Sequence, residues 1–134
     1  MPIALAARVF MVSACGDGER TAESFLKARG LPPPKQALAL RYTAVDGLRT
    51  IVHFVSLELP DDRALVFIER LPCRPDTVGM RRDTPRTPDW FNASDLKAIK
   101  YCDTGGPYDG HYHLEITTGR SPAGQTRFLL SFSD

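Results

Sequence analysis

The sequence predicts a mainly β (α+β) domain, an antiparallel meander of about six strands with one short N-terminal helix. Three observations favour this fold class. Apolar and polar residues alternate over several short stretches, which is typical of half-buried strands. The 134 residues include eleven prolines and ten glycines, which indicate many turns rather than long helices. One domain is the default expectation for this length, and residues 37–134 are predicted to form it.

A short helix is expected near the N-terminus, from Thr21 to Arg29. Thr21 is a suitable N-cap, Lys27 lies in the last turn where it suits the helix dipole, and Gly30 is a typical stop. The three prolines at 32–34 cannot continue a helix, so they are expected to form a stiff spacer.

The first three strands of the domain are predicted between residues 37 and 71. Apolar residues alternate with polar or small ones over 37–43, and Asp46 with Gly47 is a strong hairpin signal. A long second strand is expected from Leu48 to Leu59. A turn follows, and the apolar segment from Ala64 to Leu71 is predicted to be a third strand covered on both faces.

Three more strands are predicted in the second half of the chain. Residues 96–102 fit either a helix or a strand, and their alternation favours a strand after a brief helical turn. The glycine-rich residues 103–107 predict a turn. Strands are then expected over 110–118 and 125–133, with a further turn between them.

The segment between the third and fourth predicted strands, Pro72 to Trp90, is rich in proline, arginine and aspartate. A loop of this length in a compact domain is often functional. Its arginines suit charge-assisted contacts with an acidic partner, although three aspartates offset most of their charge, as in an ordinary solvated loop. The candidate partner contacts are Arg74, Arg81, Arg82 and Arg86.

Charge and motifs limit the function classes. Seventeen basic residues face sixteen acidic ones, and a net charge of +1 predicts no attraction to nucleic acid. The chain has no nucleophile-elbow motif, and no cofactor is expected, so a non-enzymatic protein is predicted.

The N-terminal residues carry the most specific motif. An apolar run ends in small residues before a cysteine, as Val12-Ser13-Ala14-Cys15, and polar residues follow. This motif resembles the lipobox of bacterial lipoproteins. The resemblance implies that residues 1–14 are a signal peptide, that Cys15 carries the lipid, and that residues 15–36 form a lipidated tether with the short helix and the proline spacer. The lipid then anchors the protein to a membrane.

The same resemblance implies a place in the cell. The protein is expected in the cell envelope, facing the periplasm, and Gly16 in place of aspartate after Cys15 favours the outer membrane. By class analogy, the expected function is binding of a protein partner, as in inhibitors, immunity proteins or assembly factors. The alternative is a cytosolic β-rich domain in which residues 1–15 contribute a structural strand.

Export also bears on the two remaining cysteines. Cys73 and Cys102 form an even pair, and in an oxidising periplasm they are expected to form a disulfide bond that closes a loop of about 30 residues. In a reducing cytosol both would instead be small buried thiols.

A metal site is the alternative function. Along a strand, His111, His113 and Glu115 point to one face with about 7 Å between alternate residues, near enough to share a zinc or copper ion. His53 on the second predicted strand is a possible fourth ligand. The same alternation also fits the solvent face of a half-buried strand.

Overall fold

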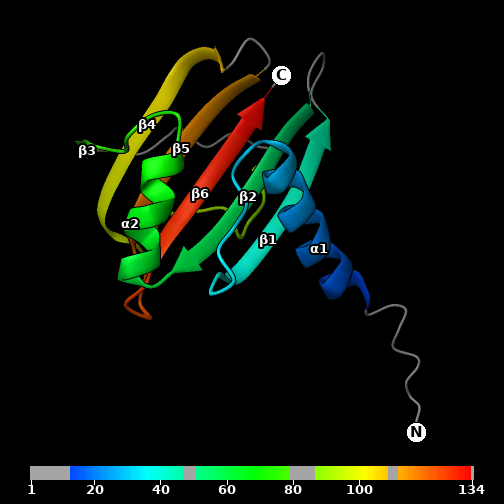
Figure 1. Ribbon diagram of the computed structural model, residues 1–134, viewed down its shortest axis with the longest axis horizontal. Coiled ribbons are helices and arrows are strands. Elements are labelled where there is room, and N and C mark those ends of the chain that lie inside the picture. Colours follow the sequence, from blue (N-terminus) through cyan, green and yellow to red (C-terminus); the bar gives the residue numbers. More distant parts are fainter. Residues whose placement is uncertain (1–12, 47–50, 79–86, 109–111, 134) are drawn as a thin grey trace, which may run out of the picture.

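The fold is an open antiparallel sheet with two short helices (Figure 1). The computed structural model describes residues 13–46, 51–78, 87–108 and 112–133. The elements are α1 (Ser13–Ala28), β1 (Leu38–Asp46), β2 (Ile51–Leu59), α2 (Asp61–Arg70), β3 (Thr77–Val78), β4 (Lys97–Tyr108), β5 (Tyr112–Arg120) and β6 (Thr126–Ser133). The mainly β class predicted from the sequence is therefore confirmed.

The strand order is β1-β2-β6-β5-β4-β3, so the sheet is not a simple meander. The C-terminal strand β6 lies between β2 and β5, and every pairing is antiparallel. This position explains why β2 and β6 are buried on both faces, whereas β1 is an edge strand.

Both helices pack on one face of the sheet (Figure 1). Leu26 from α1 and Phe67 from α2 are fully buried there, and the ring of Phe67 meets that of Phe128 edge-on at 5.0 Å between centroids. Alternate residues of three strands complete this core: Val55, Leu57, Leu59, Leu114, Ile116, Phe128, Leu130 and Phe132.

The other face is partly covered by residues 87–96, which we call the covering segment. Its Phe91 is buried against Phe54 of β2, and its Leu96 joins the same cluster with Leu129 of β6. Gly119 permits the close approach, because a Cβ atom there would lie 2.8 Å from the Cβ of Leu96. A second, smaller apolar core thus lies on the face of the sheet opposite the helices.

The predicted third strand is wrong, since residues Asp61–Arg70 form the helix α2. Ala64 and Phe67 are buried at helical spacing, whereas Leu65 and Val66 between them are 66% and 45% exposed. The helix therefore buries only one face of this apolar run in the core and leaves the other face exposed to solvent.

Two other boundaries differ from the prediction. Helix α1 begins at Ser13, before the expected N-cap Thr21, so residues 13–20 also belong to the helix. Residues 103–107 do not form a turn, because β4 continues through them to Tyr108. The predicted hairpin between β1 and β2 is present, although its Gly47 lies outside the described residues.

The expected disulfide bond is present between Cys73, which follows α2, and Cys102 in β4, with 6.2 Å between their Cα atoms. Both half-buried cysteines pack against the core beneath the two helices. The bond therefore ties the connection after α2 to the sheet.

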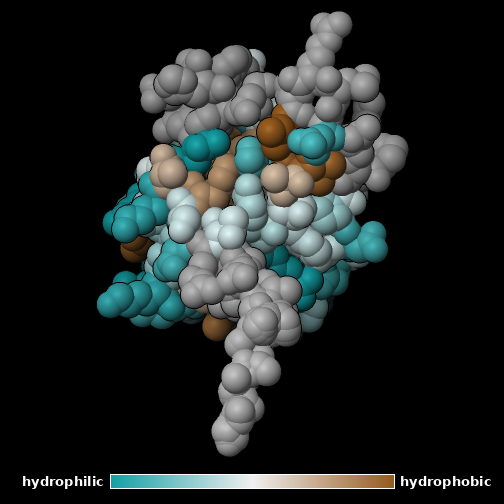
Figure 2. Space-filling view, turned by 90° about the vertical axis from the view of Figure 1, so that its right-hand side faces the viewer, coloured by the Kyte–Doolittle hydropathy of each residue, from teal (hydrophilic) through white to brown (hydrophobic). Residues whose placement is uncertain are grey.

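The side of the molecule that carries α1 and the β1 edge is largely hydrophilic over its described residues, with the largest hydrophobic area in the upper part of the view and smaller ones elsewhere (Figure 2). Over the part of the chain that the structure describes, no helix has the length and apolar character needed to cross a membrane.

Candidate functional site

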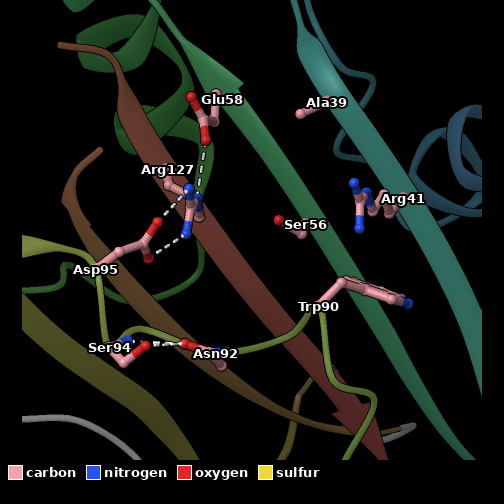
Figure 3. Close-up of a pocket in the computed structure, with 9 residues that line it drawn as sticks. All are labelled: Ala39, Arg41, Ser56, Glu58, Trp90, Asn92, Ser94, Asp95 and Arg127. Atoms are coloured by element: carbon pink, nitrogen blue, oxygen red, sulfur yellow. Dashed lines mark hydrogen bonds and ion pairs between the residues drawn. The ribbon is translucent and has the colours of Figure 1, made fainter. Parts of the chain in front are cut away.

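A polar pocket lies between the sheet and the covering segment, on the face opposite the helices (Figure 3). Its volume is about 370 Å³. Alternate residues of β1, β2 and β6 form its floor, and the covering segment forms its wall. The lining residues are Ala39, Arg41, Ser56, Glu58, Trp90, Asn92, Ser94, Asp95 and Arg127.

Arg127 of β6 is fixed between two carboxylates. Its Nη1 and Nη2 donate to both oxygens of Asp95 at 2.7 and 3.2 Å, and its Nε donates to Glu58 Oε2 at 2.9 Å. Glu58 also accepts a hydrogen bond from the Ser121 hydroxyl at 3.0 Å. The hydrogen bonds from Arg127 lower the pKa of Asp95, so this carboxylate is ionised at neutral pH.

Arg41 of β1 enters the pocket from the opposite side (Figure 3). Among the described residues, no hydrogen-bond or ion-pair partner holds its exposed side chain. A β-bulge precedes it, because three residue steps from Leu38 to Arg41 face two steps on β2. Ala39 in this bulge has φ 51°, a strained conformation for a residue other than glycine. The bulge directs the Arg41 side chain toward the pocket.

Trp90 and its neighbours form the wall. Phe91 is 1% exposed and anchors the segment, and the ring of Trp90 meets it edge-on at 6.0 Å between centroids. Asn92 Oδ1 accepts hydrogen bonds from the Ser94 amide at 2.8 Å and from the Ser94 hydroxyl at 2.7 Å. This local turn shapes the chain that presents Trp90 and Asp95.

A second cluster lies on the same face, on β4 and β5. Ligand atoms of Asp103, His113 and Glu115 all lie within 4.8 Å of one another. The Tyr101 hydroxyl lies 2.9 Å from Asp103 Oδ2 and 3.1 Å from Glu115 Oε2. Its single proton can be donated to only one of these carboxylates at a time. Burial and the neighbouring carboxylates raise the pKa of Tyr101 well above its usual range.

His113 fits a ligand role in this cluster. Its Nε2 atom is buried and has no hydrogen-bond partner in the described part of the chain, since Asp103 Oδ1 is 3.8 Å away. Zinc binds histidine nitrogen and carboxylate oxygen at about 2.0–2.2 Å, so the three ligand atoms would have to move closer together to share one ion. Hydrogen bonds from Tyr101 and from the Gly105 amide lower the pKa of Asp103 and keep it ionised.

The structure therefore brings together only part of the predicted metal set. His113 and Glu115 share a face as expected, with Asp103 as an unpredicted third member. His53 is wrong as a ligand, because it lies on the helix-covered face, stacked on Phe25 at 4.5 Å and hydrogen-bonded through Nδ1 to Tyr42 at 2.7 Å. His111 lies outside the described residues.

The other predicted residues have different outcomes. Arg74 is exposed, as a partner contact requires, whereas Arg81, Arg82 and Arg86 lie outside the described residues. Cys15 lies in the first turn of α1, and its lipidation stays a prediction.

The charged residues of the pocket were not predicted from the sequence. The alternation along β1 places Arg41 on the face opposite the apolar residues. This is the one sequence feature that indicates the position of Arg41. The contact of Glu58 with Arg127 depends on the pairing of β2 with β6, which are far apart in sequence.

Searches against protein-family models, curated proteins and solved structures find no match to this chain.

Proposed function

We propose that this protein is a lipid-anchored component of the bacterial cell envelope, facing the periplasm, whose folded domain binds a partner without catalysing a reaction. The lipid on Cys15 would be the anchor, and the disulfide-bonded sheet would be the binding module.

The disulfide bond between Cys73 and Cys102 is the observation that carries this proposal. Such bonds persist in oxidising compartments, which include the bacterial periplasm, and are rare in the cytosol. The sequence has three cysteines, so Cys15 is the third, and small residues precede it as a lipidation site requires. A periplasmic location would thus explain both the disulfide bond between Cys73 and Cys102 and a lipid on Cys15.

Helix α1 is compatible with an anchor at Cys15. Its buried side chains in the described part of the chain are Ala22 and Leu26, and both follow the expected cleavage point. Removal of residues 1–14 would take only Ser13 and Ala14 from α1. The domain would keep its described core and begin almost directly at the membrane.

The pocket supports binding rather than hydrolysis. Its lining, as described above, contains neither histidine nor cysteine, and both of its carboxylates are already hydrogen-bonded to Arg127. The Ser56 and Ser94 hydroxyls therefore have no histidine beside them in the lining to act as a general base.

Membrane fractionation of the native host tests the anchor. The wild-type protein should be in the membrane fraction and take up a labelled fatty acid, whereas Cys15→Ala should do neither. The double variant Cys73→Ala with Cys102→Ala is the control, because it removes the other two cysteines together but leaves the lipobox intact. A wild-type protein that remains soluble and unlabelled would contradict the proposal.

Metal binding is a second candidate, favoured by the cluster of Asp103, His113 and Glu115. Calorimetric titration of the chelator-treated protein with Zn²⁺ should show one saturable site that is lost in His113→Ala and in Asp103→Asn. Asp76→Asn, an exposed carboxylate outside this cluster, should leave binding unchanged. Binding that persists in both cluster variants would place the ion elsewhere.

A further inference from the structure

The pocket has two ends of opposite charge. At one end, the Arg41 guanidinium has no partner among the described residues. At the other end, Arg127 lies between Glu58 and Asp95, so one positive charge faces two negative charges and this end is net negative. Figure 3 shows Ser56 between the two ends and Trp90 along the Arg41 side.

The spacing of the two ends follows from the sheet register. Arg41 pairs with Ser56, and Glu58 lies two residues farther along β2 on the same face. The backbone positions of such diagonal neighbours are about 7–8 Å apart. Two extended residues span up to roughly 7 Å, so a dipeptide is about as long as this backbone separation.

The acidic end retains capacity for a donor. An ionised carboxylate has about four lone-pair sites. Asp95 accepts two hydrogen bonds from Arg127, and Glu58 accepts one from Arg127 and one from Ser121. The Asp95 side chain is 47% exposed, so an ammonium group in the pocket has access to it.

We propose that this pocket binds a short peptide through both of its termini. The carboxylate lies on Arg41, the ammonium lies against Asp95 and Glu58, and Trp90 flanks the peptide between them. This inference goes beyond the proposed function, because it names a ligand class and does not depend on the lipid anchor. The volume of about 370 Å³ is at the lower end of the range for ligand pockets and suits a dipeptide.

Binding in this pocket can be followed by intrinsic fluorescence, because Trp90 is the single tryptophan of the sequence. The full chain in detergent is titrated with alanylalanine, followed by tryptophan fluorescence and by calorimetry. The expected result is one saturable transition. N-acetyl-alanylalanine and alanylalanine amide each lack one terminal charge, so each should bind at least about tenfold more weakly.

Variants locate the site. Arg41→Gln should weaken alanylalanine binding at least about tenfold, and Arg41→Lys should restore part of the affinity, because the charge is kept but the paired donors are lost. Arg70→Gln is the matched control, since Arg70 is an exposed arginine at the end of α2. Circular dichroism checks that each variant is folded.

Three results would overturn the proposal. The first is the absence of a saturable signal by both methods. The second is equal affinity for N-acetyl-alanylalanine and alanylalanine, which would mean that the pocket binds a carboxylate at Arg41 but does not bind the ammonium group. The third is equal affinity in Arg41→Gln. None of them affects membrane fractionation, and a soluble, unlipidated protein that still binds alanylalanine would contradict only the anchor.

Discussion

Arg127 and Asp95 form a bidentate ion pair at the acidic end of the pocket, with Nη1–Oδ1 and Nη2–Oδ2 distances of 2.7 and 3.2 Å. The pair joins β6 to the covering segment, which otherwise reaches the sheet through the small apolar cluster around Phe91. Since Arg127 also holds Glu58 of β2, one guanidinium connects three parts of the chain.

Removal of this guanidinium should destabilise the domain. Arg127→Met leaves Glu58, which is 12% exposed, facing Asp95 without an intervening cation, and we expect a loss of about 2–3 kcal/mol in the free energy of unfolding. Arg120→Met is the control, since its pair with Asp61 is exposed and should contribute less than about 1 kcal/mol. Urea unfolding measures both values, and equal losses would contradict the assigned role of Arg127.

Acid should weaken the same contact. Arg127 lowers the pKa of Asp95 in the folded state, so the pair stabilises the fold above the unfolded value of about 3.9. This contribution is lost as the pH falls through the lower folded pKa. Unfolding measured from pH 6 to pH 2 should therefore be less pH-dependent in Asp95→Asn, whereas Asp76→Asn should follow the wild type. A wild-type acid response in Asp95→Asn would refute this assignment.

The disulfide bond should contribute strongly to stability. It closes a loop with a sequence separation of 29, so replacing Cys73 and Cys102 together by serine should lower the free energy of unfolding by about 3.5 kcal/mol in the chain-entropy model. The difference between wild type and variant should shrink greatly in a reducing buffer. A large difference that persists after complete reduction would mean that packing, not the bond, is responsible.

The bulge that directs Arg41 contains a strained residue. Ala39 has φ 51°, which glycine adopts freely, so Ala39→Gly should raise the free energy of unfolding by about 1 kcal/mol. Ala44→Gly in the same strand should lower it by about 0.5–1 kcal/mol, because Ala44 is not at a positive φ. Thermal unfolding distinguishes the two signs, and destabilisation by both variants would argue against strain at Ala39.

Much of the sheet could be predicted from the sequence, because alternation marks β1 and β6 directly and the hairpin signal at Asp46 and Gly47 marks the start of β2. The helix α2 was missed because its four consecutive apolar residues from Leu65 to Ile68 suit a buried strand equally well. The distinguishing signals were Asp61 and Asp62 in the first turn and Arg70 in the last, which complement a helix dipole.

The candidate sites were less predictable, because they depend on long-range pairing. His113 and Glu115 are close in sequence, and their shared face was expected. The position of Asp103 beside them follows from the register of β4 against β5, where Asp103 pairs with Glu115. Tyr101 and the pocket arginines depend in the same way on which strands become neighbours.

The intact mass of the protein extracted from the membranes of its native host is the decisive test of the lipid anchor on Cys15. We expect a chain without residues 1–14, bearing a diacylglycerol and an acyl chain on Cys15, whose mass rises on reduction by the two hydrogens of one disulfide bond. An unmodified chain in the soluble fraction that still begins at Met1 or Pro2 would contradict it.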